Sequence, residues 1–247
     1  MIKTEYIGKE IIWATIDRPE ARNAINYETI SELEELVHSI HNNSEIKVFI
    51  LSGSGSKSFI AGGDLKEFHS VITKEDSIQV SKRMQTLFNN IEQLPCWNIA
   101  YVNGDAYGGG IETMMAFDFI LSAEHSKFGF TQGRFYLTPG WGGLTRLIEK
   151  VGRTKALEWQ AKAEIKSATY MLEVGFINSI ATREELLEWI KPLLKNGRDF
   201  IKTLKKNSNI ACPDRQKRME AEVEPFAGLW INKEHISRVE EFIAKKK

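Results

Sequence analysis

Three consecutive glycines precede a lone carboxylate in the segment AYGGGIETMM, which runs from Ala106 to Met115. Each glycine at a helix entrance costs roughly 1 kcal/mol of stability relative to alanine. We therefore expect Gly108 to Gly110 to be approached closely by a group that side chains would exclude. Amide N–H groups at a helix start lack intrahelical acceptors and favour negative charge. The segment is a candidate anion site with an acid, Glu112, beside it.

A second glycine stretch, SFIAGGDLKEF from Ser58 to Phe68, has a similar context. It also follows an apolar strand and leads into a polar helix start, so two exposed backbone turns end strands that can be neighbours. Their N–H groups can then converge. NGDAYGGG lacks the GxGxxG spacing of a dinucleotide site, and GSGSKS lacks the four-residue gap of a P-loop. We exclude a nucleotide-triphosphate or dinucleotide site at both places.

Strand and helix patterns alternate along the first part of the chain. Apolar runs predict strands at 11–17, 48–53, 98–104 and 118–123, and apolar residues at helical spacing predict helices around 30–40 and 84–94. After Pro139 the pattern becomes mostly helical. The sequence thus predicts an α/β core, residues 1–181, and a helical C-terminal region, residues 182–247, packed on the core or on a neighbouring subunit.

Composition narrows the class of protein. The 247 residues are 42% hydrophobic and 27% charged, as in ordinary soluble globular proteins. The 33 basic residues balance 33 acidic ones, so no broad positive field would attract nucleic acid or acidic membranes. The start carries no signal-peptide core, and TMMAFDFILSA is too short to span a bilayer.

Cysteine and histidine usage adds two expectations. Cys96 and Cys212 have no metal-like spacing, and so few cysteines suit a reducing compartment, most simply the cytoplasm. The five histidines share no spacing typical of a metal site. We therefore expect a cytoplasmic protein without a metal centre, and we expect it to bind neither nucleic acid nor membrane.

With these segments the sequence resembles the crotonase family, also called the enoyl-CoA hydratase/isomerase family, which acts on acyl-CoA thioesters. DRPEARNAIN, FIAGGDL, NGDAYGGGIE and TPGWGG match the family's pattern in order and spacing over nearly the whole chain. The resemblance implies an α/β fold with a crotonase-type ββα spiral core, assembled as a homotrimer or a dimer of trimers. It also implies coenzyme A as part of the substrate and no separate cofactor.

The resemblance places an oxyanion hole at the backbone N–H groups of Gly63 and Gly109. An enolate forms when a proton or a carboxyl group leaves the carbon beside a thioester carbonyl, and each aimed donor is worth roughly 3 to 4 kcal/mol toward that charge. We expect glycine at these positions because a Cβ would hold the thioester oxygen away from the backbone. Other substrate-binding positions implied by the family, mostly through backbone, are Arg22, Asn23, Ala24, Ala61, Asp64 and Leu65.

The acids distinguish the possible reactions. Family hydratases use two glutamates, and here the first is Glu112 whereas the second position holds Gln132. An amide does not exchange protons near neutral pH, so hydration or isomerisation by the usual acids is disfavoured. The family's decarboxylases for methylmalonyl-CoA and ethylmalonyl-CoA include members that keep only the first glutamate. TPGWGGLTRLIEKVG resembles the WGG segment of the ethylmalonyl-CoA type.

The predicted function is decarboxylation of a small malonyl-type CoA, with enoyl-CoA hydratase or isomerase activity as the alternative. An inactive acyl-CoA-binding subunit is an alternative of another class. Glu112 would position the departing carboxylate or donate a proton, unless it only caps its own helix. Four further roles stay open: Gln132 as a group that orients substrate or water, Arg134 as a carboxylate partner or surface charge, Trp141 as pocket wall or core, and Lys245–Lys247 near CoA phosphates or solvated.

Overall fold

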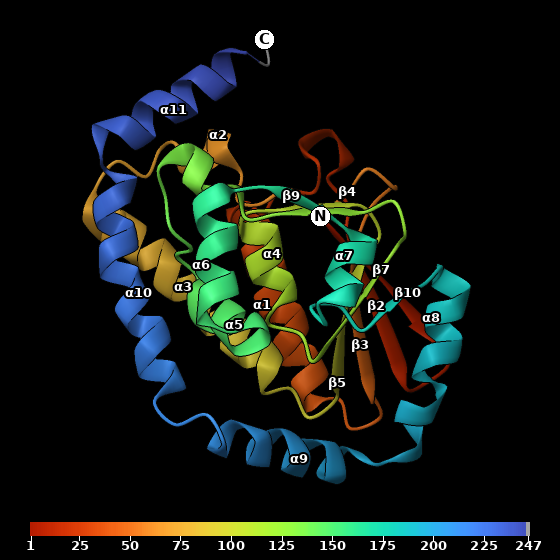
Figure 1. Cartoon of the computed structure of the whole chain (residues 1–247). Helices are drawn as coiled ribbons and strands as arrows, with labels where there is room; N and C mark the ends of the chain where they lie inside the picture. Colours follow the sequence, from red (N-terminus) through yellow and green to blue (C-terminus); the bar gives the residue numbers. More distant parts are fainter. Residues whose placement is uncertain (246–247) are drawn as a thin grey trace.

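The computed structural model of the chain describes residues 1–245, which form two sheets surrounded by helices (Figure 1). The larger sheet has the order β1-β2-β3-β5-β7-β10, from β1 (Ile2–Ile7), β2 (Ile11–Ile16), β3 (Val48–Gly53), β5 (Trp97–Val102), β7 (Phe119–Ser122) and β10 (Ser179–Ile180). The smaller sheet has the order β4-β6-β8-β9, from β4 (Ser58–Ile60), β6 (Asp105–Tyr107), β8 (Lys127–Gly129) and β9 (Ile165–Ser167). All pairings are parallel except β1 with β2 and β8 with β9, so most strands are joined by crossovers that contain helices.

Helices occupy the crossovers and the whole C-terminal region. Those before β10 are η1 (Pro19–Ala21), α1 (Tyr27–Asn42), α2 (Leu65–Phe68), α3 (Lys74–Glu92), α4 (Gly109–Met114), η2 (Thr131–Phe135), α5 (Gly143–Val151), α6 (Arg153–Lys162) and α7 (Ala168–Glu173). After β10 follow α8 (Arg183–Ile190), η3 (Lys191–Lys195), α9 (Arg198–Ile210), α10 (Arg215–Trp230) and α11 (Lys233–Ala244). The expected change to a mostly helical pattern after Pro139 is confirmed, with two short strands, β9 and β10, that the sequence did not predict.

The two long helices of the core begin at capping residues and bury the stripes that the sequence predicts. The Asn26 side chain accepts a hydrogen bond from an amide in the first turn of α1, and Thr73 does the same for α3. Beyond the end of α3, Pro95 prevents further helix. The buried apolar residues of the two helices are Ile30, Leu33, Val37, Ile40, Met84, Leu87, Phe88 and Ile91.

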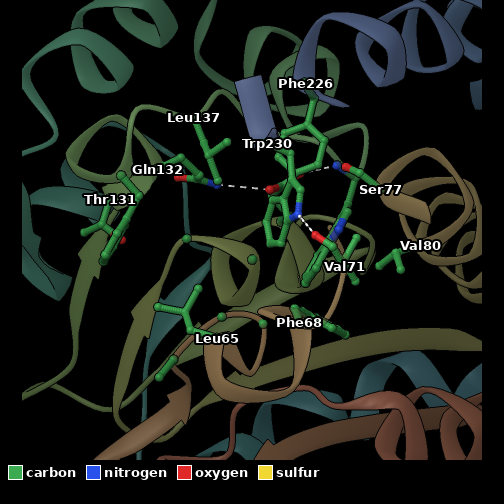
Figure 2. Close-up of a pocket in the computed structure, with 18 residues that line it drawn as sticks. Leu65, Phe68, Val71, Ser77, Val80, Thr131, Gln132, Leu137, Phe226 and Trp230 are labelled. Carbon is green, nitrogen blue, oxygen red and sulfur yellow. Dashed lines mark hydrogen bonds between the residues drawn. The ribbon is translucent and has the colours of Figure 1, made fainter. Parts of the chain in front are cut away.

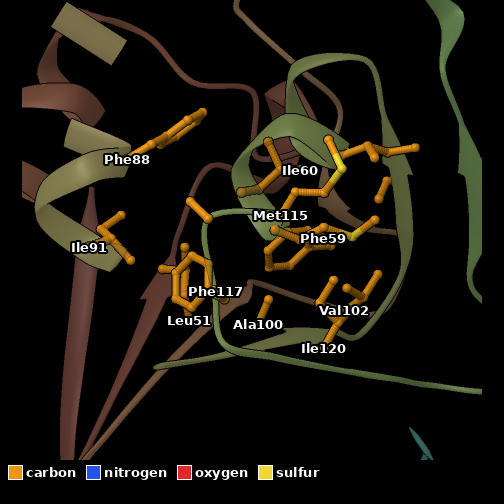
Figure 3. Packing of buried hydrophobic residues seen from close by; sticks show 14 of the residues in the cluster. Leu51, Phe59, Ile60, Phe88, Ile91, Ala100, Val102, Met115, Phe117 and Ile120 are labelled. Atoms are coloured by element: carbon orange, nitrogen blue, oxygen red, sulfur yellow. The ribbon is translucent and has the colours of Figure 1, made fainter. Parts of the chain in front are cut away.

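The larger of two apolar clusters among the described residues joins the larger sheet to α3 and to the end of α4 (Figure 3). From the sheet come Leu51, Ala100, Val102 and Ile120; from α3 come Phe88 and Ile91; and between them lie Phe59, Ile60, Met115 and Phe117. All of these side chains are at most 3% exposed. The glycine stretches are therefore attached to strands and a helix that the core holds rigidly.

The strands that lead into the two glycine stretches are neighbours, as expected, but they belong to the smaller sheet. β3 and β5 pair in parallel, and each then turns into a second, three-residue strand, β4 or β6. β4 and β6 pair in parallel as well, with Ile60 opposite Ala106. Gly63 and Gly109 follow these short strands. The sequence analysis missed this second sheet because three residues carry no readable alternation.

The C-terminal helices pack on the core of their own chain, which decides one of the two alternatives left open by the sequence. In Figure 1, α9 runs below the sheets and α10 rises beside α3 and α5. The Gln85 amide on α3 donates to the Met219 carbonyl (2.7 Å), and the Trp230 indole donates to the Val71 carbonyl (2.9 Å). Within residues 1–245, no helix combines the length and apolar content that a bilayer crossing requires.

Close packing of α4 on β4 depends on Gly110. A Cβ at this position would overlap the carbonyl group of Ile60, with the carbonyl carbon only 2.8 Å away. We expect Gly110→Ala to lower the free energy of unfolding by at least about 2 kcal/mol, because α4 must move away from β4. Urea denaturation measures this difference.

Gly228→Ala is the matched control for that substitution. Gly228 lies within α10, and a Cβ there meets no atom within 4 Å. We expect this variant to be as stable as the parent or more stable, because alanine favours a helix. Equal stability of the two variants would show that α4 does not need the close approach.

Candidate active site

Gly63 and Gly109 line one cavity, with Gly63 after β4 and Gly109 at the start of α4. In the described part of the chain, neither amide N–H donates to a protein acceptor. The loops also touch, because a Cβ on Gly62 would lie 3.5 Å from the Gly109 nitrogen. Two unpaired N–H donors beside one cavity are what an oxyanion hole requires.

Each glycine of the triplet is needed for a different reason. Gly108 has φ +52° and ψ −117°, a backbone conformation that side chains disfavour. At Gly109 a Cβ would come within 2.7 Å of Cη2 of Trp141, and Gly110 packs on Ile60. Room for a thioester oxygen, the expected reason for glycine at position 109, stays a prediction. The structure adds a second reason, because the Trp141 indole excludes a side chain there.

Trp141 is both a wall of the cavity and part of the core, so the two alternatives raised by the sequence apply together. Its ring lies against Gly109, and Cη2 would be 3.4 Å from a Cβ on Gly63. On its other side the ring meets Phe88 edge to face, with centroids 6.1 Å apart. The side chain is 7% exposed and lines the cavity. One indole therefore lies against both glycine loops.

Glu112 projects from α4 to the start of another helix, α5. Its Oε2 accepts hydrogen bonds from the amides of Trp141 (2.8 Å) and Gly143 (3.1 Å). Its Oε1 accepts one from Nε2 of Gln132 (3.0 Å). The possibility that Glu112 merely caps its own helix is wrong, because the groups that donate to its carboxylate all lie outside α4.

Burial controls the charge of Glu112, which is 3% exposed. Desolvation raises the pKa of Glu112 from its ordinary value of 4.5 to about 7. Hydrogen bonds from Trp141 and Gln132 oppose this rise in pKa, and the charge of Glu222 adds to it. Glu112 can therefore gain and lose a proton near neutral pH.

Gln132, at the start of η2, is the other polar group beside Glu112 (Figure 2). It is 8% exposed and donates through Nε2 to Glu112, whereas its buried Oε1 has no protein partner. Turning the amide by 180° would present Oε1 to a protonated Glu112. Gln132 can thus pair with either protonation state of the acid.

The remaining walls of the cavity are mainly apolar (Figure 2). They include Phe68, Val71, Val80, Leu137, Phe226 and Trp230. The cavity volume is about 110 Å³, below the roughly 150 Å³ of an engineered cavity that holds benzene. Among the described residues that line it, Glu112 is the only one with a charged side chain. The site is suited to a short, largely apolar group.

Two of these walls, Phe226 and Trp230, were not foreseen as site residues. They lie four residues apart on α10, more than a hundred positions from the glycine stretches. Their spacing indicates one buried helix face. The same spacing fits a core stripe or a ligand wall, so the sequence held no signal that separated the two.

The other implied substrate-binding positions divide into two groups. Ala61 and Leu65 line the cavity. Four do not, namely Arg22, Asn23, Ala24 and Asp64. Asn23 is 1% exposed and donates to the carbonyls of Ser54 and Ser58. Asp64 pairs with Arg18 (2.8 Å) and caps α2. The side chains of Asn23 and Asp64 thus hold the glycine loop in place.

Other groups that the sequence singled out lie apart from the cavity. Arg134 donates through Nε and Nη2 to the Ala163 carbonyl (3.1 and 2.7 Å) and does not line the cavity, so a direct role as a carboxylate partner is not supported. Cys96 is buried, and Cys212 is half-buried. Within residues 1–245 no cluster of histidine, cysteine and acidic residues could hold a metal ion. Of the C-terminal lysines, Lys246 and Lys247 lie outside the described residues.

Fold and site together define an α/β protein of the crotonase class. The chain belongs to the enoyl-CoA hydratase/isomerase family, whose model matches residues 7–247. Its fold is similar to the crystal structure of enoyl-CoA hydratase from Bacillus halodurans, with a TM-score of 0.89, 23% identity, and coverage of 97% of this chain and 99% of that one. The expected crotonase-type core with a helical C-terminal region is confirmed.

Relatives with different activities match the sequence at the same identity, although the hydratase match covers more of both chains. Crotonyl-CoA hydratase of Syntrophomonas wolfei subsp. wolfei is 30% identical over 237 residues, covering 94% of this chain and 91% of the relative. Ethylmalonyl-CoA decarboxylase of Xenopus laevis is 30% identical over 225 residues, covering 87% of this chain and 74% of the relative. Identity alone therefore does not assign the reaction.

The raised pKa of Glu112 makes the stability of the protein depend on pH. Between its ordinary value of 4.5 and about 7, the folded protein binds a proton that the unfolded chain releases, so stability falls as pH rises through this range. Glutamine at position 112 cannot ionise and keeps the hydrogen-bonding shape. As the pH rises from 4 to 8, we expect the free energy of unfolding of Glu112→Gln to increase by about 3 kcal/mol relative to that of the parent.

Denaturant unfolding at a series of pH values measures this gain. Glu220→Gln, on the exposed face of α10, is the control that changes the same charge without burial. If the free energies of unfolding of the parent and of Glu112→Gln changed with pH in the same way, Glu112 would titrate as an ordinary exposed acid.

Proposed function

We propose that the protein decarboxylates a small malonyl-type acyl-CoA. The observation that carries the proposal is the pairing of Glu112 with an amide, Gln132, in a cavity lined by no other charged side chain among the described residues. Hydration of a double bond by the family's usual route requires two acid–base groups, whereas decarboxylation requires one proton donor. The site offers one.

The reaction follows from the positions of the donors and the acid. The bond between the α-carbon and the free carboxylate breaks, CO2 leaves, and the electron pair passes to the thioester as an enolate. The amides of Gly63 and Gly109 would donate to the enolate oxygen. Glu112, protonated in part near neutral pH, would then transfer its proton to the α-carbon and regain one from solvent.

The electrostatics of the cavity favour loss of the carboxylate. Apolar walls do not stabilise its charge, and no cationic side chain lines the cavity among the described residues. In the transition state the charge moves toward the thioester oxygen, beside the two N–H donors. Interactions that are stronger in the transition state than in the bound substrate are those that increase rate.

The volume of about 110 Å³ supports a short acyl group. The match to an ethylmalonyl-CoA decarboxylase supports the same substrate class. We further propose a cytoplasmic homotrimer or dimer of trimers that uses coenzyme A only as part of its substrate. These features are implied by the family resemblance and stay predictions.

Hydratase or isomerase activity is the second candidate, because crotonyl-CoA hydratase is 30% identical to this chain. A hydratase of this sequence would need a second proton-exchanging group in place of Gln132. An inactive acyl-CoA-binding subunit is the candidate of another class, and it would keep the cavity and the two amides without turnover.

Mass spectrometry of the products distinguishes these candidates. We expect methylmalonyl-CoA or ethylmalonyl-CoA to lose CO2, and Glu112→Gln to lower turnover at least a hundredfold, by an order-of-magnitude estimate, with little change in CoA affinity. Addition of water to crotonyl-CoA with no loss of CO2 would support the hydratase instead. Tight binding without any product would support the inactive subunit.

Position 132 provides a separate test of why hydration is disfavoured. We expect Gln132→Glu to increase hydration of crotonyl-CoA by at least about tenfold, because it restores a second acid 3.0 Å from Glu112. The KM of the malonyl-type substrate should rise in the same variant, since a second carboxylate repels the substrate's own. Gln132→Met, similar in length and unable to exchange protons, is the control and should not gain hydration. Equal rates of crotonyl-CoA hydration by the parent and Gln132→Glu would show that the amide of Gln132 is not the reason why hydration is disfavoured.

A further inference from the structure

The N-terminus of α5 is held by two carboxylates from two other helices. Gly142 occupies the cap position and provides no side-chain acceptor. Glu112, on α4, accepts from the amides of Trp141 and Gly143. Glu222, on α10, accepts from the amides of Leu144 (3.1 Å) and Thr145 (2.7 Å), and from the Thr145 hydroxyl (2.5 Å).

The two carboxylates are close because their donors are consecutive in the chain. Neighbouring Cα atoms are about 3.8 Å apart, and each acid lies one hydrogen bond from its own amide. The amides of Gly143 and Leu144 each donate over 3.1 Å. The two carboxylates are therefore within roughly 10 Å of each other, a range over which like charges in a protein interact appreciably.

The other charged groups near this loop are already paired. Arg146, on α5, donates to the carbonyls of Trp141 (3.0 Å) and Gly142 (3.3 Å) and pairs with Glu92 (2.8 Å) on α3. Glu92 is paired with Arg215 as well (2.8 Å). From η2 come the neutral Gln132 and Arg134, whose guanidinium is bound to the Ala163 carbonyl. Among the described residues, Glu222 forms no ion pair.

We propose that Glu222 is a positioning residue of the active site, whose negative charge at the start of α5 favours the protonated form of Glu112. This inference deepens the proposed function, because a protonated Glu112 is the group that would protonate the enolate. It also gives α10 a second role. The helix that supplies Phe226 and Trp230 to the cavity wall would set the charge of the acid within it.

The electrostatics agree with this geometry. The charge of Glu222 raises the pKa of Glu112, in addition to the larger effect of burial. Burial raises the pKa of Glu222 too, opposed by hydrogen bonds from Thr145 and Leu144 and by the charge of Arg146. The two acids therefore compete for ionisation, and a change in one must appear in the titration of the other.

Infrared titration of the protonated carboxyl groups tests this coupling without any reaction. Near neutral pH ordinary carboxyl groups are ionised, so the remaining bands belong to buried acids, and loss of a band in Glu112→Gln assigns Glu112. We expect Glu222→Gln to lower the titration midpoint of Glu112 by about one pH unit. Glu222→Asp, which keeps the charge, should restore most of the parent midpoint.

Glu220→Gln is the matched control on the same helix. Its exposed side chain accepts from Gln216, one turn earlier on α10, so its removal should leave the midpoint of Glu112 unchanged. An unchanged midpoint in folded Glu222→Gln would overturn the proposal. A shift that Glu222→Asp fails to restore would also overturn it, since it would mark loosened packing rather than lost charge.

Reciprocity provides a second measurement that does not need Glu222→Gln to fold. If the charges couple, Glu112→Gln must lower the midpoint of Glu222 by the same amount. Absence of that shift would overturn the proposal by itself.

Kinetics separate this inference from the proposed function. The pH above which decarboxylation declines should fall together with the Glu112 midpoint in Glu222→Gln, at unchanged KM. If Glu222→Gln shifted the Glu112 midpoint but the protein had no decarboxylase activity, the coupling between the two acids would stand and the proposed reaction would be rejected.

Discussion

The hydrogen bonds from the start of α5 to the buried carboxyl group of Glu112 are the constraint on which the site depends. An acid that is 3% exposed requires donors, and the backbone supplies two of them at Trp141 and Gly143. The loop must then come so close that a Cβ on Gly143 would lie 2.5 Å from Oε2 of Glu112. The same approach brings the Trp141 ring against the glycine loops. Thus one buried acid determines the path of the chain from Trp141 to Gly143 and, through it, the wall behind both free amides.

Much of this arrangement could be predicted from local patterns in the sequence. The long helices and the strands of the larger sheet have continuous apolar periodicity, and the glycine stretches stand out because glycine is costly at a helix start. Glu112 stands out because it lies just after the glycine triplet, and Gln132 because it occupies the position of the family's second glutamate. The smaller sheet was not found, since its strands have only three residues each. The close approach of the Trp141 ring to Gly109 could not be predicted either, because the two residues are 32 positions apart in the sequence.

The C-terminal region illustrates a different limit of sequence reasoning. Its apolar stripe on α10 predicts a buried helix face, and Met219, Val223 and Phe226 are indeed buried. Nothing in that spacing indicates which surface the helix covers. In the folded chain α10 places Phe226 and Trp230 in the cavity and Glu222 on α5. The candidate site is therefore assembled across the boundary between the predicted core and the predicted helical region, and contacts of that range are set by tertiary packing.

The position of the Trp141 ring restricts how this site can change during evolution. Because the ring occupies the space of a side chain at Gly109, a larger residue there requires a smaller one at position 141, whereas a side chain at Gly63 would first meet Phe68. Gly109 and Trp141, which are distant in sequence, must then be inherited as a group. Lineages that alter the group together would acquire a differently spaced pair of amide donors, whereas lineages that alter one member alone would lose the pocket.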